Sequence, residues 1–135
     1  MSELRERFMN ALLRRPSTRK QAREFLLKCH AVEEEIASLM AEAEGMGLID
    51  DEGSAKLFVD GHLHWGNLKI AHELAMRGIR REEIETALDE AEDDSKRAKE
   101  IAESWRRGGI EERKIASRLA GRGFTRRAIS SAMEK

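Results

Sequence analysis

An internal repeat constrains this chain more than any other feature of its sequence. Residues of the middle part recur 45 positions later, with the same order of apolar, basic and glycine positions and without a gap. A looser copy, shifted by 48 residues, occupies the first part of the chain, where His30 takes the position of the glycine. Chains with repeats of this length form arrays in which neighbouring units stack. The matched pairs are Ile70 and Ile115, Ala71 and Ala116, Leu74 and Leu119, Arg77 and Arg122, Gly78 and Gly123, Ile79 and Phe124, Ile84 and Ile129, Ala87 and Ala132, and Leu88 and Met133.

The spacing of apolar residues within one repeat predicts helices. Ile70 and Leu74 lie four residues apart, Gly78 interrupts, and Ile84 and Leu88 resume the same spacing, a pattern typical of helix, turn and helix. A further amphipathic segment precedes each such pair, so each unit is expected to contain three helices. These leading segments carry Leu4, Phe8, Ala11 and Leu12 in the first unit, Ala55, Phe58, Val59 and Leu63 in the second, and Ala98, Ile101, Ala102 and Trp105 in the third.

The sequence therefore predicts an all-α fold, an elongated, curved array of three tandem three-helix repeats. The expected units are residues 1–48, 49–94 and 95–135, divided at glycine-rich or acidic junctions. The composition agrees, because one proline and no tyrosine in 135 residues favour helices over strands. A three-helix unit of about 45 residues buries only a small core, so we expect the units to depend on one another.

Several residues are expected to begin or end these helices. Gly78 follows Arg77 at a helix end, where glycine adopts a left-handed conformation at little cost and a cation suits the helix dipole. Thr18 with Gln21 forms a capping-box pattern. Acidic pairs introduce the second and third units, Asp50 and Asp51 before one and Asp93 and Asp94 before the other, which favours helix N-termini there.

Charge is distributed unevenly along the chain. The totals of 25 basic and 26 acidic residues give a net charge of −1, which excludes a strongly basic nucleic-acid binder. Counted by unit, the net charge is 0 over residues 1–48, −8 over 49–94 and +7 over 95–135, which sums to −1. This asymmetry indicates a charged partner or contacts between the units.

The strongest candidate for a binding surface is a basic stripe in the third unit. Lys114, Arg118 and Arg122 recur at four-residue spacing beside the apolar Ile115 and Leu119, so one helix face presents all three cations. Such a stripe suits phosphates or acidic side chains of a partner. The alternative is a solvated face that the acidic middle unit balances. The other basic candidates are Arg106, Arg107, Arg113, Arg126 and Arg127.

The two tryptophans have different expected roles. Trp105 occupies an apolar position of a leading helix, which favours packing between helices. Trp65 precedes Gly66 in a link between helices. We favour packing of its ring over the neighbouring repeat. The alternatives are stacking on a base or anchoring a protein contact, and for these Trp65 is kept as a candidate contact residue, together with Lys69 and Arg77.

No pattern for catalysis or metal binding is found. His62, His64 and His72 do not follow a metal-ligand spacing, and the single cysteine, Cys29, excludes an intrachain disulfide and a cysteine-framed zinc site. Phosphate loops and nucleophile elbows are missing too. We expect no enzymatic activity, no cofactor and no metal. Charged residues interrupt the apolar positions of the first 15 residues, which argues against a signal peptide or a membrane span, and we expect a cytoplasmic protein.

The middle unit resembles a known family. The stretch Gly47-Leu48-Ile49-Asp50-Asp51, followed by Phe58-Val59, Gly66, Ile70, Leu74, Arg77-Gly78-Ile79 and Glu82-Glu83-Ile84, resembles the central signature of the bacterial regulatory protein family RecX, and the resemblance extends over essentially the whole chain. It implies three tandem three-helix repeats and a partner, the RecA filament on single-stranded DNA. It also implies inhibition of recombinase and co-protease activity in recombination, DNA repair and the SOS response. We further expect a monomer, weak direct contact with DNA and no membrane association.

One stretch departs from the family pattern. The family usually has an arginine-rich link between the first two helices of its middle repeat, whereas residues 61–67 are shorter and almost uncharged, with His62 where arginine is common. This departure favours a second hypothesis. In that hypothesis the chain is a small helical protein-interaction or single-stranded nucleic-acid-binding module without RecA activity.

Overall fold

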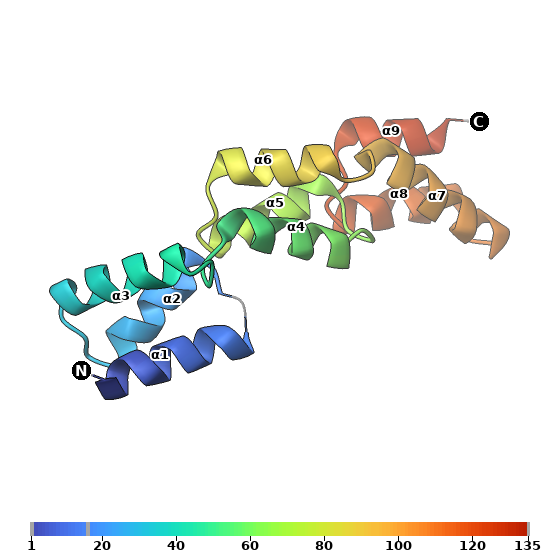
Figure 1. The fold of residues 1–135 in the computed structure, drawn as a ribbon. Coiled ribbons are helices and arrows are strands. Elements are labelled where there is room, and N and C mark those ends of the chain that lie inside the picture. The colour runs from blue at the N-terminus through green and yellow to red at the C-terminus, as the bar shows by residue number, and fades with distance from the viewer. Residues whose placement is uncertain (1, 16, 135) are drawn as a thin grey trace.

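The computed structural model describes residues 2–15 and 17–134, and these residues form nine α-helices in three successive groups of three (Figure 1). Met1 and Lys135, at the outer ends of the predicted first and third units, lie outside the described residues. The all-α fold and the three helices per unit are confirmed. The helices are α1 (Ser2–Arg14), α2 (Arg19–Lys28), α3 (Glu33–Gly45), α4 (Asp51–Gly61), α5 (Asn67–Met76), α6 (Arg81–Glu90), α7 (Asp94–Arg107), α8 (Glu112–Gly121) and α9 (Arg126–Met133).

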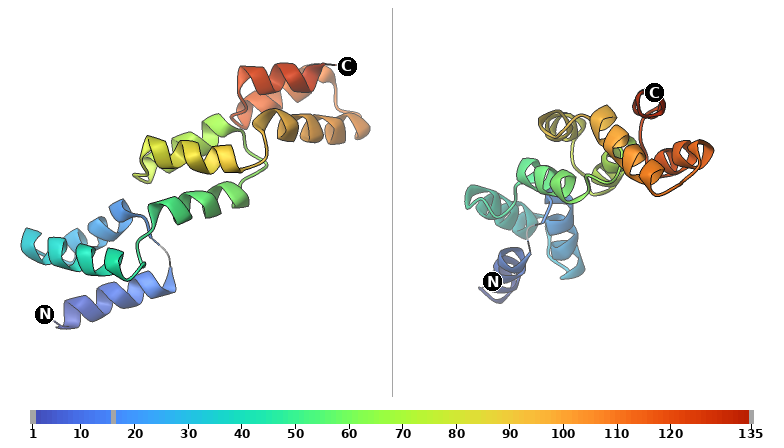
Figure 2. Two further views of the ribbon diagram at one scale, coloured as in Figure 1. Left: turned by 45° about the horizontal axis from the view of Figure 1, so that its top comes forward. Right: turned by 90° about the vertical axis from the view of Figure 1, so that its right-hand side faces the viewer.

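The three groups follow one another along an extended path, with the two ends of the chain at opposite ends of the molecule (Figure 2). Each group encloses its own small apolar core. Phe8, Leu26 and Ile36 are the largest residues of the first core. The second core centres on Val59, Ile70 and Leu74, and the third on Ile115, Leu119 and Phe124. The elongated array is therefore a series of small cores, as the repeat predicts.

The turns after α2, α5 and α8 share one conformation. Gly78 and Gly123 have φ angles of 84° and 83°, and His30 takes the equivalent place with a φ of 63°. After α5, the Gly78 amide donates to the Ala75 carbonyl at 2.9 Å and the Ile79 amide donates to the Leu74 carbonyl at 3.1 Å. These bonds close the helix end in the way glycine permits. The predicted left-handed glycine is confirmed, and so is the match of His30 to it.

The predicted helix starts are confirmed as well. Thr18 accepts a hydrogen bond from the Gln21 amide, while the Gln21 side chain accepts one from the Thr18 amide, which completes the capping box. Asp50 caps α4 by accepting from the Gly53 amide at 3.0 Å, and Asp93 caps α7 by accepting from the Ser95 amide at 2.7 Å. These side chains satisfy amides that a helix N-terminus leaves without a partner.

Successive units meet through their middle helices. At the first junction, the Thr18 hydroxyl at the start of α2 donates to the Arg77 carbonyl at the end of α5, at 3.0 Å. At the second, the Gly66 amide at the start of α5 donates to the Arg122 carbonyl at the end of α8, at 2.8 Å. The Leu68 amide also donates to the Gly123 carbonyl at 2.9 Å. The start of one middle helix thus binds the end of the next.

Among the described residues, none of the helices combines the length and the apolar character that a membrane crossing requires.

Candidate functional site

The basic surface of the third unit is organised around Trp105. This half-buried indole lies on α7 and packs on the third core, as its position in the sequence predicts. The guanidinium carbon of Arg122 lies 5.0 Å from the centre of the ring, and that of Arg118 lies 5.6 Å away. Cations over an aromatic face at this distance are attracted to it. Two of the predicted basic side chains, one in the last turn of α8 and one directly after it, are therefore held over one ring.

The remaining basic candidates differ in their surroundings. Arg107, Arg113, Lys114, Arg126 and Arg127 are exposed. Arg106 instead donates to the Glu112 carboxylate at 2.8 Å and to the Ala132 carbonyl at 2.7 Å. Because these partners belong to α8 and α9, Arg106 joins all three helices of the third unit. Its place on the binding surface stays a prediction, although its observed contacts are internal.

Aromatic side chains also gather around the link between α4 and α5. His62 stacks on Phe58 with 3.9 Å between ring centres and lies 4.5 Å from Trp65. The Lys69 ammonium lies 4.2 Å from the centre of the Trp65 ring. Trp65 thus packs on the core of its own unit, and packing of its ring over the neighbouring repeat stays a prediction. The contact with the third unit is made by the main chain of the link, because His64 and Gly66 bond there to Arg122.

The histidines of this link are held by local contacts. The Nδ1 atom of His62 lies 2.7 Å from the Phe58 carbonyl oxygen. Desolvation lowers the pKa of His64, and the positive charges of Arg122, His62 and Lys69 lower it further. In the part of the chain that the structure describes, no three or more His, Cys, Asp or Glu side chains form a cluster suited to a metal ion, and the histidines of this link are included in that statement.

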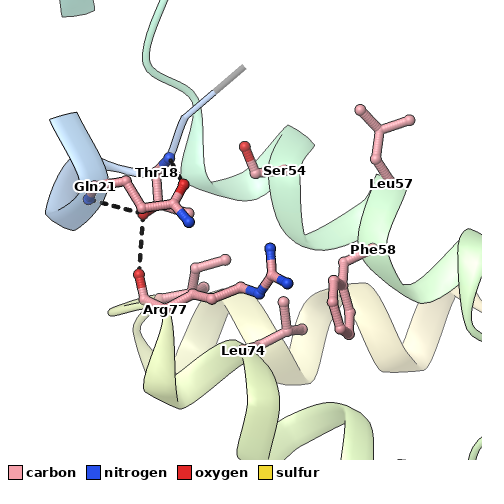
Figure 3. Close-up of a pocket in the computed structure, with 8 residues that line it drawn as sticks. Thr18, Gln21, Ser54, Leu57, Phe58, Leu74 and Arg77 are labelled. Carbon is pink, nitrogen blue, oxygen red and sulfur yellow. Dashed lines mark hydrogen bonds between the residues drawn. The ribbon is translucent and has the colours of Figure 1, made fainter. Parts of the chain in front are cut away.

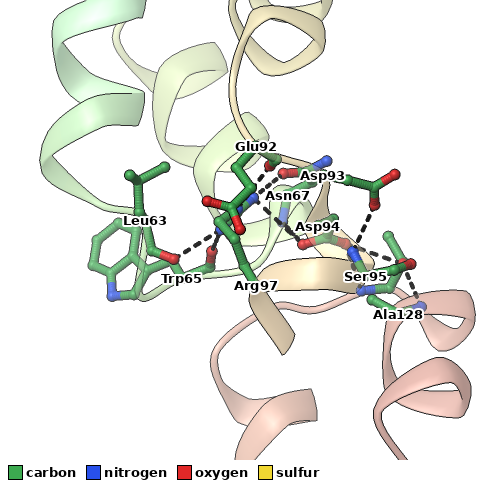
Figure 4. Close-up of polar contacts among 10 residues, drawn as sticks. Leu63, Trp65, Asn67, Glu92, Asp93, Asp94, Ser95, Arg97 and Ala128 are labelled. Carbon is green, nitrogen blue, oxygen red and sulfur yellow. Dashed lines mark hydrogen bonds and ion pairs between the residues drawn. The ribbon is translucent and has the colours of Figure 1, made fainter. Parts of the chain in front are cut away.

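Asp94 and Arg97 form a buried ion pair that the residue pattern alone does not predict, and this pair joins the second and third units (Figure 4). Both side chains are less than a tenth exposed, and their charged atoms lie 3.5 Å apart. Arg97 donates to the carbonyls of Leu63 and Trp65 in the link and to the side chain of Asn67 at the start of α5. Burial lowers the pKa of Arg97, while Asp94 opposes that shift.

Asp94 completes this network on the other side. Its carboxylate accepts from the Asn67 amide at 3.1 Å and from the Thr125 hydroxyl at 3.1 Å. Thr125 in turn caps α9 by accepting from the Ala128 amide. Helix α7, helix α9 and the link therefore share one polar network. The only sequence signal for it is the three-residue spacing of Asp94 and Arg97, which an exposed helix start would show equally.

A groove lies at the junction of the first and second units (Figure 3). It encloses about 290 Å³, and Phe58, Leu74 and Ile79 provide its apolar surface. The Arg77 guanidinium lies over the Phe58 ring, 4.7 Å from its centre. Other lining residues are Thr18, Gln21, Ser54 and Leu57.

The fold and its surfaces define a helical-repeat protein with an uneven charge distribution, and one of its three units is similar to a known domain. Residues 50–88 match the family model of the second three-helix domain of RecX. A comparison with curated proteins finds no match.

Two crystal structures share the fold of the whole chain. RecX from Lactobacillus salivarius is 22% identical and superposes with a TM-score of 0.86, covering 98% of this chain and 93% of that one. A second structure, of regulatory protein RecX, is 21% identical with a TM-score of 0.81, covering 99% of this chain and 71% of that one. These two structures show that the chain shares their fold over its whole length, and within that fold residues 50–88 match the family model of a single domain.

Proposed function

We propose that this chain is a regulatory protein that binds RecA filaments on single-stranded DNA and inhibits their recombinase and co-protease activity. The observation that carries the proposal is the match of residues 50–88 to the RecX second three-helix domain, within a chain of RecX fold. The protein would act in recombination, DNA repair and the SOS response. It would work as a cytoplasmic monomer and without catalysis of its own.

The shape and charge of the molecule support this proposal. An elongated array spreads its contacts over a long surface, which suits a partner that is itself a long polymer. The third unit carries the cations Arg118 and Arg122 over Trp105 and a net charge of +7. A positive surface of this kind attracts acidic side chains or phosphates and accelerates encounter with them. Weak direct contact with DNA would use the same face.

Co-sedimentation with RecA filaments on single-stranded DNA tests the proposal. We expect the wild-type protein to pellet with filaments, to remain in solution with the DNA alone, and to slow strand exchange. The variant Lys114→Glu/Arg118→Glu should bind filaments more weakly, because both side chains are exposed on the basic face. The matched control is Arg7→Glu/Arg14→Glu, which reverses two exposed charges on α1. Equal binding by the two double variants would reject the basic face, and no binding by the wild type would reject the function.

The link between α4 and α5 favours a second candidate function. The half-buried His62 and Trp65, with Lys69 over the indole, combine aromatic rings with a cation, as surfaces that stack single-stranded bases do. In this case the chain would be a small helical single-stranded nucleic-acid-binding or protein-interaction module without RecA activity. Binding to single-stranded DNA alone, steeply weakened by salt and unchanged by RecA, would favour it.

A further inference from the structure

The groove between the first and second units has the composition of a protein-binding site. Leu74 and Ile79 form buried parts of its surface, Phe58 is half-buried, and Leu57 at its edge is 67% exposed. The residues that contribute most to binding between proteins are often aromatic residues and arginines that lie beside a small apolar pocket. The exposed Leu57 is the kind of apolar surface that a partner would cover.

Arg77 is the one cation lining this groove, and within residues 2–15 and 17–134 it forms no ion pair. Its guanidinium is instead held over Phe58. By contrast, Arg80 and Arg81, a few residues later, pair with Glu83 and Glu85. The planar guanidinium is thus positioned, with its donors available for a carboxylate from outside.

The same arrangement recurs in the third unit. Arg122 stands 45 residues after Arg77, at the equivalent helix end, and lies over Trp105 of the leading helix. Each of the last two units therefore presents an arginine over an aromatic ring at the same point of its fold. In the first unit, the equivalent helix ends in Cys29, so the pair is limited to the second and third units.

Charge decides which class of partner fits the groove. The middle unit carries a net charge of −8, which repels a polymer of phosphates. A protein segment with a single carboxylate meets much less of this repulsion than a polyanion does, and with an aliphatic side chain beside the carboxylate it matches both the cation and the apolar surface. We propose that this groove binds a segment of a partner protein that presents an aliphatic side chain beside a carboxylate. This rests on the proposed function, in which the partner protein is RecA.

Two variants test the groove, each with a matched control. Arg77→Gln removes the cation, and its control Arg81→Gln removes an exposed arginine of the same unit away from the groove. Leu57→Ser removes the apolar edge, and its control Leu13→Ser changes a leucine of the same 67% exposure on α1. The probe is the RecA filament on fluorescently labelled single-stranded DNA. We expect Arg77→Gln and Leu57→Ser each to weaken binding about tenfold, with both controls binding as the wild type does.

Each outcome decides a different point. If the wild type binds filaments and Arg77→Gln and Leu57→Ser bind equally well, the groove is rejected while the proposed function stands. If the wild type does not bind filaments, both fail. If the two variants lose binding to single-stranded DNA in the absence of RecA, the groove belongs to nucleic acid and the protein partner is rejected. Circular dichroism and thermal unfolding of Arg77→Gln, with Arg77→Lys as a charge-preserving variant, separate lost contact from lost structure.

Discussion

Gly66 lies directly against the main chain of Phe124, so closely that a Cβ atom at Gly66 would come within 2.2 Å of the Phe124 Cα and amide nitrogen. A methyl group cannot occupy that space unless the backbone moves. The second and third units therefore meet main chain to main chain, and the contact depends on the absence of a side chain at Gly66. The same junction also constrains the turn glycine Gly123, which has a positive φ and where a Cβ would come within 2.6 Å of the Lys69 amide nitrogen.

Replacement of Gly66 by alanine should destabilise the protein. We expect Gly66→Ala to lower the free energy of unfolding by about 2 kcal/mol, in the range that overpacking produces, as measured by urea denaturation. Gly121→Ala is the control, because a Cβ there meets nothing within 4 Å and Gly121 lies in α8, where alanine favours the helix by up to about 1 kcal/mol. Equal stability of the two variants would show that the junction can shift.

Substitutions in the turns after α2 and α5 should change the stability of the protein in opposite directions. Gly78→Ala should cost about 1 kcal/mol or more, because Gly78 has a φ of 84° and a Cβ would meet the Lys20 side chain at 2.6 Å. His30→Gly should stabilise the chain by roughly 1 kcal/mol, because His30 adopts a left-handed conformation that glycine tolerates. Thermal unfolding of both variants checks the signs. A lower melting temperature for His30→Gly would mean that the histidine side chain contributes more than its backbone costs.

Loss of Arg97 should be among the most damaging single changes. Arg97→Met keeps much of the side-chain length but leaves Asp94 buried without its cation, so we expect about 3–5 kcal/mol of destabilisation. Hydrogen exchange should also accelerate in the link at residues 61–67, where Arg97 donates to the carbonyls of Leu63 and Trp65. The double variant Asp94→Asn/Arg97→Met should recover part of the loss. A cost below about 1 kcal/mol for Arg97→Met would contradict the role of the network.

Glu83 gives a prediction about pH. Burial raises the pKa of Glu83, and the nearby Asp51, Glu52 and Asp50 add to the shift, while Arg80 opposes it. The folded chain therefore binds this proton more tightly than the unfolded chain, and ionisation of Glu83 costs stability as the pH rises through the raised pKa. Glu83→Gln should raise the melting temperature at about pH 7 and change it little at about pH 3, where both states are protonated.

The control for this prediction is Glu82→Gln, which removes an exposed carboxylate from the same first turn of α6. It should not show the same gain at neutral pH. If the two variants respond identically to pH, the effect comes from the net charge of the middle unit rather than from the position of Glu83.

The repeat was sufficient to predict most of the fold. Helices, turns and caps depend on residues close together in sequence, so Thr18 with Gln21, or Gly78 after Arg77, could be interpreted without the structure. The match of His30 to a glycine position also followed from alignment alone, although histidine gives no local sign of a positive φ.

The contacts between units could not be predicted, because they depend on segments far apart in sequence. Asp94 and Arg97 are typical of a solvated helix start, and their burial comes from the link at residues 63–67 and from Thr125. For the same reason, the internal bonds of Arg106 and the packing of Trp65 on its own unit were missed. The basic face was predictable as a charge pattern, but the position of Arg118 and Arg122 over Trp105 was not.

The hydrogen bonds from Gly66 and Leu68 to the end of α8 have a consequence for the evolution of such chains. They join main-chain atoms, which substitutions on the exposed surface leave in place as long as Gly66 and Gly123 are kept. The rise and rotation from the second unit to the third are therefore encoded by a backbone register and by the buried network of Asp94 and Arg97, and the exposed side chains do not determine them. A lineage can rewrite most of its surface chemistry, adapting to a partner that also changes, while the pitch of the array stays the same.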